Sequence, residues 1–224
     1  KVLYDNTNTV DWIGGFGSAR YNTEQLTAFG VFGWTSSSFT VTDHFTPYNS
    51  STHQSSFQSS GEGGALMLTN NNLTGTQLKL GARYFLSPAV SFFANFGSIN
   101  KVPILDQAID DEDYLIIENP VQENFTSIEI GTRASLMNNQ LTVNAVYYNS
   151  QWNDRQARKY AQNEEGTSIV ANLEGLDQLH TGFEVEVAYQ PMPLLRVDAA
   201  LGIGNWTYTD DVKASYDDWD SGVK

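Results

Sequence analysis

The stretch QLHTGFEVEVAYQPMPLLRVDAAL, residues 178–201, alternates between apolar and polar side chains on both sides of a proline-containing turn. Successive side chains of a β-strand point to opposite faces, so this pattern predicts two antiparallel strands joined by a tight turn. One face carries Glu184, Glu186, Arg196 and Asp198, and the other carries no charged residue. Two such different faces must meet two different environments.

The same alternation recurs upstream and predicts about eight strands of roughly 10–16 residues, whereas strands of soluble proteins average about 5–6. Their ends alternate between tight turns and three long polar loops. Tight turns at one end and long loops at the other are typical of an outer-membrane β-barrel. We expect strands at about 10–23, 25–42, 76–87, 89–100, 123–137, 140–153, 178–190 and 194–209, and long extracellular loops at about 43–75, 101–122 and 156–177.

The two faces allow a soluble and a membrane interpretation. In a soluble sandwich the apolar face would form the core, whereas in a membrane barrel it would meet lipid and the polar face would line the lumen. A tilted strand needs about 9–11 residues to cross the hydrocarbon layer, and a lipid-facing Arg or Lys costs about 2–4 kcal/mol. Strand length, loop asymmetry and the uncharged face favour the membrane. The charged residues expected to face the lumen are Lys79, Arg83, Glu129, Arg133, Glu184, Glu186, Arg196 and Asp198.

Composition excludes several other classes of protein. The 224 residues have a formal net charge of −14, which argues against a nucleic-acid surface, and they include no cysteine, which excludes disulfides and zinc–thiolate sites. No apolar run reaches the roughly 18 residues of a transmembrane helix, and no N-terminal signal peptide is recognisable. Because the chain begins at Lys1 and ends in a polar acidic run, we interpret it as a fragment or a mature segment.

No residue pattern predicts catalysis. The three histidines, His44, His53 and His180, are too scattered for a metal or catalytic site, and no Gly-x-Ser-x-Gly elbow is present. We therefore expect a protein that is not an enzyme and has no cofactor.

Two acidic clusters could hold Ca²⁺, because carboxylate oxygens are its preferred ligands. Neither has the spacing of an EF-hand, so solvated loops are the favoured interpretation. The clusters comprise Asp106, Asp110, Asp111, Glu112, Asp113 and Glu118, and Asp217, Asp218 and Asp220.

Residues 123–156 and 175–211 resemble the barrel of TonB-dependent outer-membrane receptors. The resemblance lies in ENFTSIEIG, a short Asn turn, a strand that ends in Tyr-Tyr and Trp-x-Asp-Arg, and a second hairpin that ends in Trp-x-Tyr. It is good over about 76–211, is weaker over 1–45, and looks similar to receptors of Bacteroidota-type bacteria.

The resemblance implies a 22-stranded barrel, closed by an N-terminal plug domain, that imports a nutrient with energy from a TonB complex. The implied substrate is a siderophore, oligosaccharide, peptide or vitamin, and a surface lipoprotein is a possible partner. Because about eight strands are present and neither a plug nor a TonB-contacting box is recognisable, we interpret the chain as an internal barrel segment. A small autonomous barrel acting as an adhesin or passive pore, and a soluble β-rich binding domain, remain the alternatives.

Substrate contacts are expected near the long-loop ends of the strands. The candidates are Trp152, Asp154, Arg155, Trp206 and Tyr208. By alternation Trp152 and Trp206 point to the polar face unless a bulge intervenes. A packing role or a place in an interfacial aromatic girdle is the favoured alternative for both tryptophans.

Overall fold

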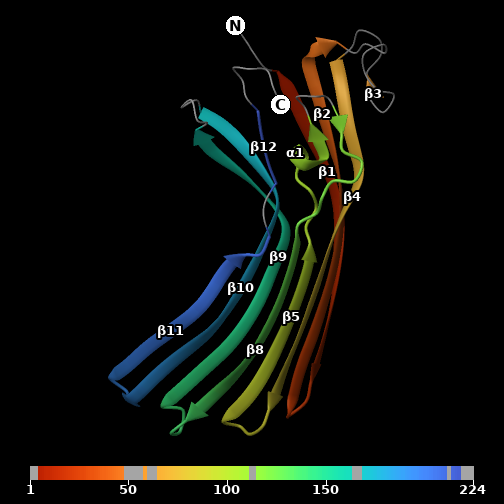
Figure 1. The fold of residues 1–224 in the computed structure, drawn as a ribbon. Helices are drawn as coiled ribbons and strands as arrows, with labels where there is room; N and C mark the ends of the chain where they lie inside the picture. The colour runs from red at the N-terminus through yellow and green to blue at the C-terminus, as the bar shows by residue number, and fades with distance from the viewer. Residues whose placement is uncertain are drawn as a thin grey trace. The chain divides into compact units, whose positions relative to one another are not determined.

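The computed structural model describes residues 5–47, 58–59, 65–110, 115–162, 168–210 and 213–217, which are almost entirely β-strand (Figure 1). Among these residues, no helix has the length and apolar character needed to cross a membrane. The elements are β1 (Asn6–Asn22), β2 (Leu26–Pro47), β3 (Gln58–Ser59), β4 (Ala65–Phe85), β5 (Val90–Asn100), α1 (Leu105–Ala108), β6 (Ile109–Asp110), β7 (Leu115–Ile116), β8 (Asn124–Leu136), β9 (Leu141–Gln162), β10 (Ser168–Met192), β11 (Leu195–Tyr208) and β12 (Lys213–Asp217).

The long strands form a single sheet in the order β1-β2-β4-β5-β8-β9-β10-β11, in which each long strand pairs with the next one along the chain. β3 adds to β4, β12 adds to β10, and β6 and β7 form a separate pair. Each of the segments predicted as strands corresponds to one strand of this path, so the predicted all-β, antiparallel fold is confirmed.

The chain divides into two compact units, one of residues 17–32, 77–100 and 123–224, here called the ladder unit, and one of residues 1–16, 33–76 and 101–122, here called the loop unit. In the ladder unit β5, β8, β9, β10 and β11 lie side by side (Figure 1). The register between β8 and β9 is unbroken from Asn124 to Leu136. One rung of the ladder joins Asn95, Glu129, Tyr148, Gly182 and Gly204.

The apolar face of the ladder unit is exposed in the structure. On strands that are paired on both sides, Ile128 and Ile130 of β8 are 45% and 57% exposed, and Phe183 of β10 is 48% exposed. A soluble sandwich would bury such a face in its core, because exposed apolar surface of this extent is unfavourable in water. The exposure therefore argues against the soluble alternative and for contact with lipid.

The loop unit has a buried apolar cluster of its own. Leu66 and Leu68 of β4 are 0% and 1% exposed and pack with Ala108 and Ile109, which α1 and β6 supply. The side-chain amide of Asn70 donates to the carbonyl oxygens of Ala108 at 2.9 Å and of Ile117 at 2.8 Å. Residues 101–110 and 115–122 are thus anchored to β4 by apolar packing and by one bidentate amide.

The predicted loop boundaries were wrong at three places. β9 continues to Gln162 and β10 begins at Ser168, so most of the predicted loop 156–177 is paired strand. β2 and β4 likewise extend into the predicted loop 43–75, and the predicted loop 101–122 contains α1, β6 and β7. Polar composition suggested loops, but a strand ladder is held by backbone hydrogen bonds and does not require apolar side chains on either face.

Candidate functional site

The tryptophan side chains of the candidate site lie on the polar face of the ladder unit. Gln178 of β10 pairs with Trp152 of β9 on one side and with Tyr208 of β11 on the other, so the three form one rung. Trp206 pairs with His180 in the next rung. Residues that pair directly across strands share a face of the sheet. The register is continuous from these rungs to Glu184 on β10 and to Glu129 on β8, so both tryptophans lie on the face of these glutamates.

A bulge next to Trp152 brings Arg155 onto the same face. The backbone of Asp154 is left-handed, with φ 57°, and its N–H donates to Asp177 Oδ1 at 2.8 Å. The register between β9 and β10 shifts on both sides of Leu176. An extra residue on one strand reverses the alternation that follows, so Arg155 turns toward Trp152 instead of away from it.

The indole of Trp152 is held on several sides. The guanidinium of Arg155 lies 4.5 Å from the ring centroid, and Arg155 Nη1 donates to Gln178 Oε1 at 3.3 Å. Phe125 meets the ring edge-on at a centroid distance of 6.0 Å, and Trp152 Nε1 donates to a carboxylate oxygen of Glu123 at 3.3 Å. Glu123 and Gln178 are both buried, so a cation, two aromatic rings and two buried polar groups meet here.

Trp206 belongs to a second aromatic cluster one rung away. Its ring stacks on that of His180, with centroids 5.9 Å apart and an angle of 29° between the planes. Its Nε1 donates to the hydroxyl of Tyr148 at 3.1 Å. Trp206 and Tyr208 are both exposed and lie on the polar face.

Aromatic rings on this face lie over glycines of neighbouring strands. A Cβ placed on Gly131 would lie 2.7 Å from Phe93 Cε1, and one placed on Gly182 would lie 2.5 Å from Tyr148 Cζ. The glycines leave room for rings to lie flat on the sheet, an arrangement that shields the backbone next to a glycine.

Three of the charged side chains of the polar face, Arg83, Glu129 and Glu186, have neutral hydrogen-bond partners. Arg83 donates to Ser91 Oγ, and the carboxylates of Glu129 and Glu186 accept from the amides of Asn95 and Asn144. An ion pair on this face runs along one strand, between Arg196 and Asp198 at 2.8 Å. Both partners belong to β11, so this ion pair does not link neighbouring strands.

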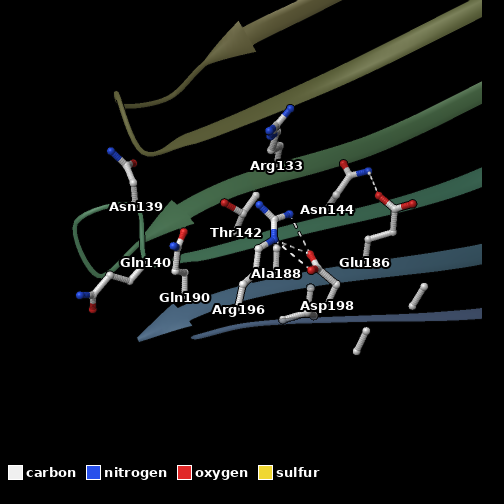
Figure 2. Close-up of a pocket in the computed structure, with 13 residues that line it drawn as sticks. Arg133, Asn139, Gln140, Thr142, Asn144, Glu186, Ala188, Gln190, Arg196 and Asp198 are labelled. Carbon is white, nitrogen blue, oxygen red and sulfur yellow. Dashed lines mark hydrogen bonds and ion pairs between the residues drawn. The ribbon is translucent and has the colours of Figure 1, made fainter. Parts of the chain in front are cut away.

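A hollow of about 580 Å³ opens on the same face toward the tight turns (Figure 2). Figure 2 shows the Arg196–Asp198 pair on β11 and the contact between Asn144 and Glu186 at its wall. Arg133 lies in the same rung as Asn144 and Glu186, so the lining of the hollow contains both positively and negatively charged side chains.

The sequence matches a protein-family model over almost its whole length. The model described as TonB dependent receptor-like, beta-barrel, matches residues 2–223. The chain belongs to this family. It is therefore part of the β-barrel of a TonB-dependent receptor in the bacterial outer membrane, as its alternating faces and its resemblance to such receptors predicted.

One of the similar solved structures shows the same fold. The copper transporter OprC matches with a TM-score of 0.62 and 16% identity over 90% of this chain and 30% of that chain. FpvA of P. aeruginosa, bound to a heterologous ferric pyoverdine, matches with a TM-score of 0.44 and 15% identity over 99% of this chain and 34% of that chain. The FpvAI–pyocin S2 complex matches with a TM-score of 0.44 and 14% identity over 91% and 34%. The chain thus spans about a third of the length of these structures, and a search of curated proteins gave no match.

The sequence singled out the two tryptophans and Arg155 as candidates, but not the residues that contact them in the structure. Tyr148, His180 and Gln178 could have been found by writing out the strand register, because each shares a rung with a residue already singled out or with one next to it. Glu123 gave no such signal. Among the predicted candidates, Asp154 contributes its backbone, which forms the centre of the bulge.

The two acidic clusters, for which solvated loops were the favoured interpretation, lie partly outside the described residues. Asp106 is in α1, Glu118 is exposed after β7, and Asp217 ends β12, whereas Asp111, Glu112, Asp113, Asp218 and Asp220 lie outside the described residues. Within the described part of the chain, no group of three or more His, Asp or Glu side chains is arranged to hold a metal ion.

Proposed function

We propose that the whole protein imports a nutrient across the bacterial outer membrane with energy supplied through TonB, and that this chain forms part of its barrel wall. The observation that carries the proposal is the family match over residues 2–223, in a sheet whose segments 77–85, 90–100, 124–136, 141–153, 178–190 and 195–208 have one uncharged apolar face and one charged face. In a large barrel of this kind, the apolar face meets lipid and the polar face lines the lumen.

The proposed lumen wall has two regions. Toward the tight turns it carries the charged hollow with Arg133, Glu186, Arg196 and Asp198, which would face a plug domain of the same protein. Toward the long loops it carries the two aromatic clusters, which would face the incoming nutrient. Their exposed rings and hydrogen-bonding groups are typical of sites that bind small molecules.

The nutrient contacts that we propose are Trp152, Arg155, Trp206 and Tyr208, with Asp154 setting the position of Arg155. Arg155 is fixed between the Trp152 ring and Gln178, and Trp206 is fixed by His180 and Tyr148. Side chains held in place before a ligand arrives lose less entropy when it binds, which supports a binding role. A siderophore, an oligosaccharide, a peptide or a vitamin remains compatible with this wall.

The proposed partners follow from the same function. They are outer-membrane lipid, a plug domain, and the TonB complex, which would be contacted through a region N-terminal to this chain. A surface lipoprotein that delivers the nutrient is a further proposed partner.

TonB dependence tests the proposal. Cells that contain the receptor, cells that lack its gene and cells that lack TonB are grown in a defined medium, and the compounds that disappear from the medium are measured by mass spectrometry. We expect at least one compound to be depleted only when both the receptor and TonB are present. Depletion that requires the receptor but proceeds without TonB would contradict the proposal and favour a passive pore.

A further inference from the structure

The strongest unassigned feature of the polar face is the way in which one tyrosine reaches across two strands. Tyr148 lies on β9, and its hydroxyl accepts a hydrogen bond from the indole of Trp206 on β11, with β10 between them. Neighbouring strands are about 4.8 Å apart, so two steps cover almost 10 Å. The phenol and the indole bridge this distance together, and the phenol can reach toward β11 only if it lies flat on the sheet.

Two glycines make the flat position possible. Gly182 and Gly204 occupy the same rung as Tyr148, one on each of the next two strands. A Cβ on Gly182 would lie 2.5 Å from Tyr148 Cζ, and a Cβ on Gly204 would lie 2.9 Å from the tyrosine oxygen and 3.1 Å from Trp206 Nε1. These distances are shorter than van der Waals contact, so any other residue at either position would displace the phenol or the indole.

The indole is held from a second direction by His180. The imidazole stacks on the Trp206 ring at a centroid distance of 5.9 Å, and the two residues are direct partners in the ladder. The hydrogen bond from Nε1 fixes the direction of the ring edge, while the stack fixes its plane. Together they select one orientation of a side chain that is 69% exposed and would otherwise rotate among several rotamers.

We propose that Tyr148, lying across Gly182 and Gly204, is a positioning residue that fixes Trp206 in the orientation in which it contacts the nutrient. The inference rests on the proposed import function. Tyr148 itself need not touch the nutrient, because it acts through the indole.

The first test measures the indole directly and does not depend on transport. The whole receptor is labelled with 5-fluorotryptophan, purified in detergent and studied by ¹⁹F NMR, and the Trp206 signal is assigned from its absence in Trp206→Phe. Tyr148→Phe keeps the ring but removes the hydroxyl, and Gly204→Ala inserts a methyl group at the contact. We expect both to shift or broaden the Trp206 signal while the other tryptophan signals stay unchanged.

Gly202→Ala is the matched control. Gly202 lies on the same strand and the same face, two residues before Gly204, but a Cβ there would meet only Glu184 Cγ, at an ordinary 3.8 Å. We expect this variant to leave the Trp206 signal in place. An unchanged signal in Tyr148→Phe and Gly204→Ala, or an equal change in Gly202→Ala, would overturn the proposal.

The second test measures TonB-dependent uptake of the compound found by the depletion experiment. We expect Tyr148→Phe to raise the KM of uptake about three- to tenfold with little change in the maximal rate, because a loosened indole must be ordered when the nutrient binds. A KM equal to that of the wild type would overturn the proposal. Failure of the import function would instead appear as uptake that does not need TonB, with the NMR result unaffected.

Discussion

The guanidinium of Arg155 lies over the Trp152 ring, 4.5 Å from its centroid, although the two residues stand at opposite parities of the same strand. The left-handed backbone of Asp154 between them makes the contact possible, because the bulge reverses the alternation for the residues that follow. The cation is further held by Gln178, so its position on the polar face is set before any ligand arrives.

Loss of this fixed charge should weaken nutrient binding. We expect Arg155→Gln to raise the KM of TonB-dependent uptake about three- to tenfold, equivalent to roughly 0.7–1.4 kcal/mol of binding free energy. Arg133→Gln removes a cation from the same face near the tight turns and should leave the KM unchanged. A larger effect of Arg133→Gln than of Arg155→Gln would place the nutrient contacts at the wrong end of the strands.

The bulge itself can be tested at Asp154. The left-handed region is costly for a residue with a side chain, most of all for a β-branched one. Asp154→Gly should therefore keep the free energy of unfolding or raise it slightly, and Asp154→Val should lower it by about 1–2 kcal/mol. Unfolding of the receptor in urea, followed by tryptophan fluorescence, measures both. Equal stability of the Gly and Val variants would mean that Asp154 does not carry the bulge.

Gly131 should tolerate no side chain. An added methyl group would lie 2.7 Å from Phe93 Cε1 and 2.7 Å from the backbone oxygen of Ala145, and the backbone oxygen cannot move aside. We expect Gly131→Ala to destabilise the receptor by about 1–3 kcal/mol, as for other overpacked sites. Gly97→Ala is the control, because nothing lies within 4 Å of a Cβ at that position. The measurement is the urea concentration at which half of each variant is unfolded. Equal midpoints for the two variants would contradict the tight packing of Phe93 on Gly131.

The side chain of Asn70 should limit the local opening of residues 101–110 and 115–122, which follow β5. Its amide serves the carbonyl oxygens of both Ala108 and Ile117, so Asn70→Ala would leave two acceptors without this donor. We expect faster hydrogen exchange at the backbone amides of residues 101–110 and 115–122, measured by mass spectrometry. Asn144→Ala, which removes an amide in the ladder unit, should not affect these residues. Unchanged exchange in Asn70→Ala would show that apolar packing alone anchors the segment.

The alternation of side chains was sufficient to predict the strands, the faces and the antiparallel pairing. In the hairpin of residues 178–201 the pattern identified both strands and the face that carries Glu184 and Glu186, because a period of two leaves little choice once one face is apolar. The boundaries at the long-loop ends were not predictable in the same way. The sequence of residues 156–162, QARKYAQ, shows no strict alternation, and their pairing with β10 is set by backbone hydrogen bonds.

The candidate site was predictable only where it follows the alternation. Parity placed Trp152 and Trp206 on the polar face, but it placed Arg155 on the opposite one, and no residue type marked Asp154 as the centre of a bulge. The role of Gly182 and Gly204 was hidden for another reason. Strand glycines have several uses, and only the register shows that both lie in the rung of Tyr148.

The central claim is that the uncharged face of the sheet meets lipid and the charged face lines the lumen. Because this chain contains no cysteine, single cysteines can be introduced at consecutive positions of β8 to carry a spin label, in a receptor from which any thiol outside this chain has been removed. The positions Ser127, Ile128, Glu129 and Ile130 alternate between the two faces. The measurement is the collision rate of each label with oxygen, which concentrates in the hydrocarbon layer, in receptors reconstituted in lipid. We predict high rates at 128 and 130 and low rates at 127 and 129, and the reverse order, or no alternation, would contradict the account.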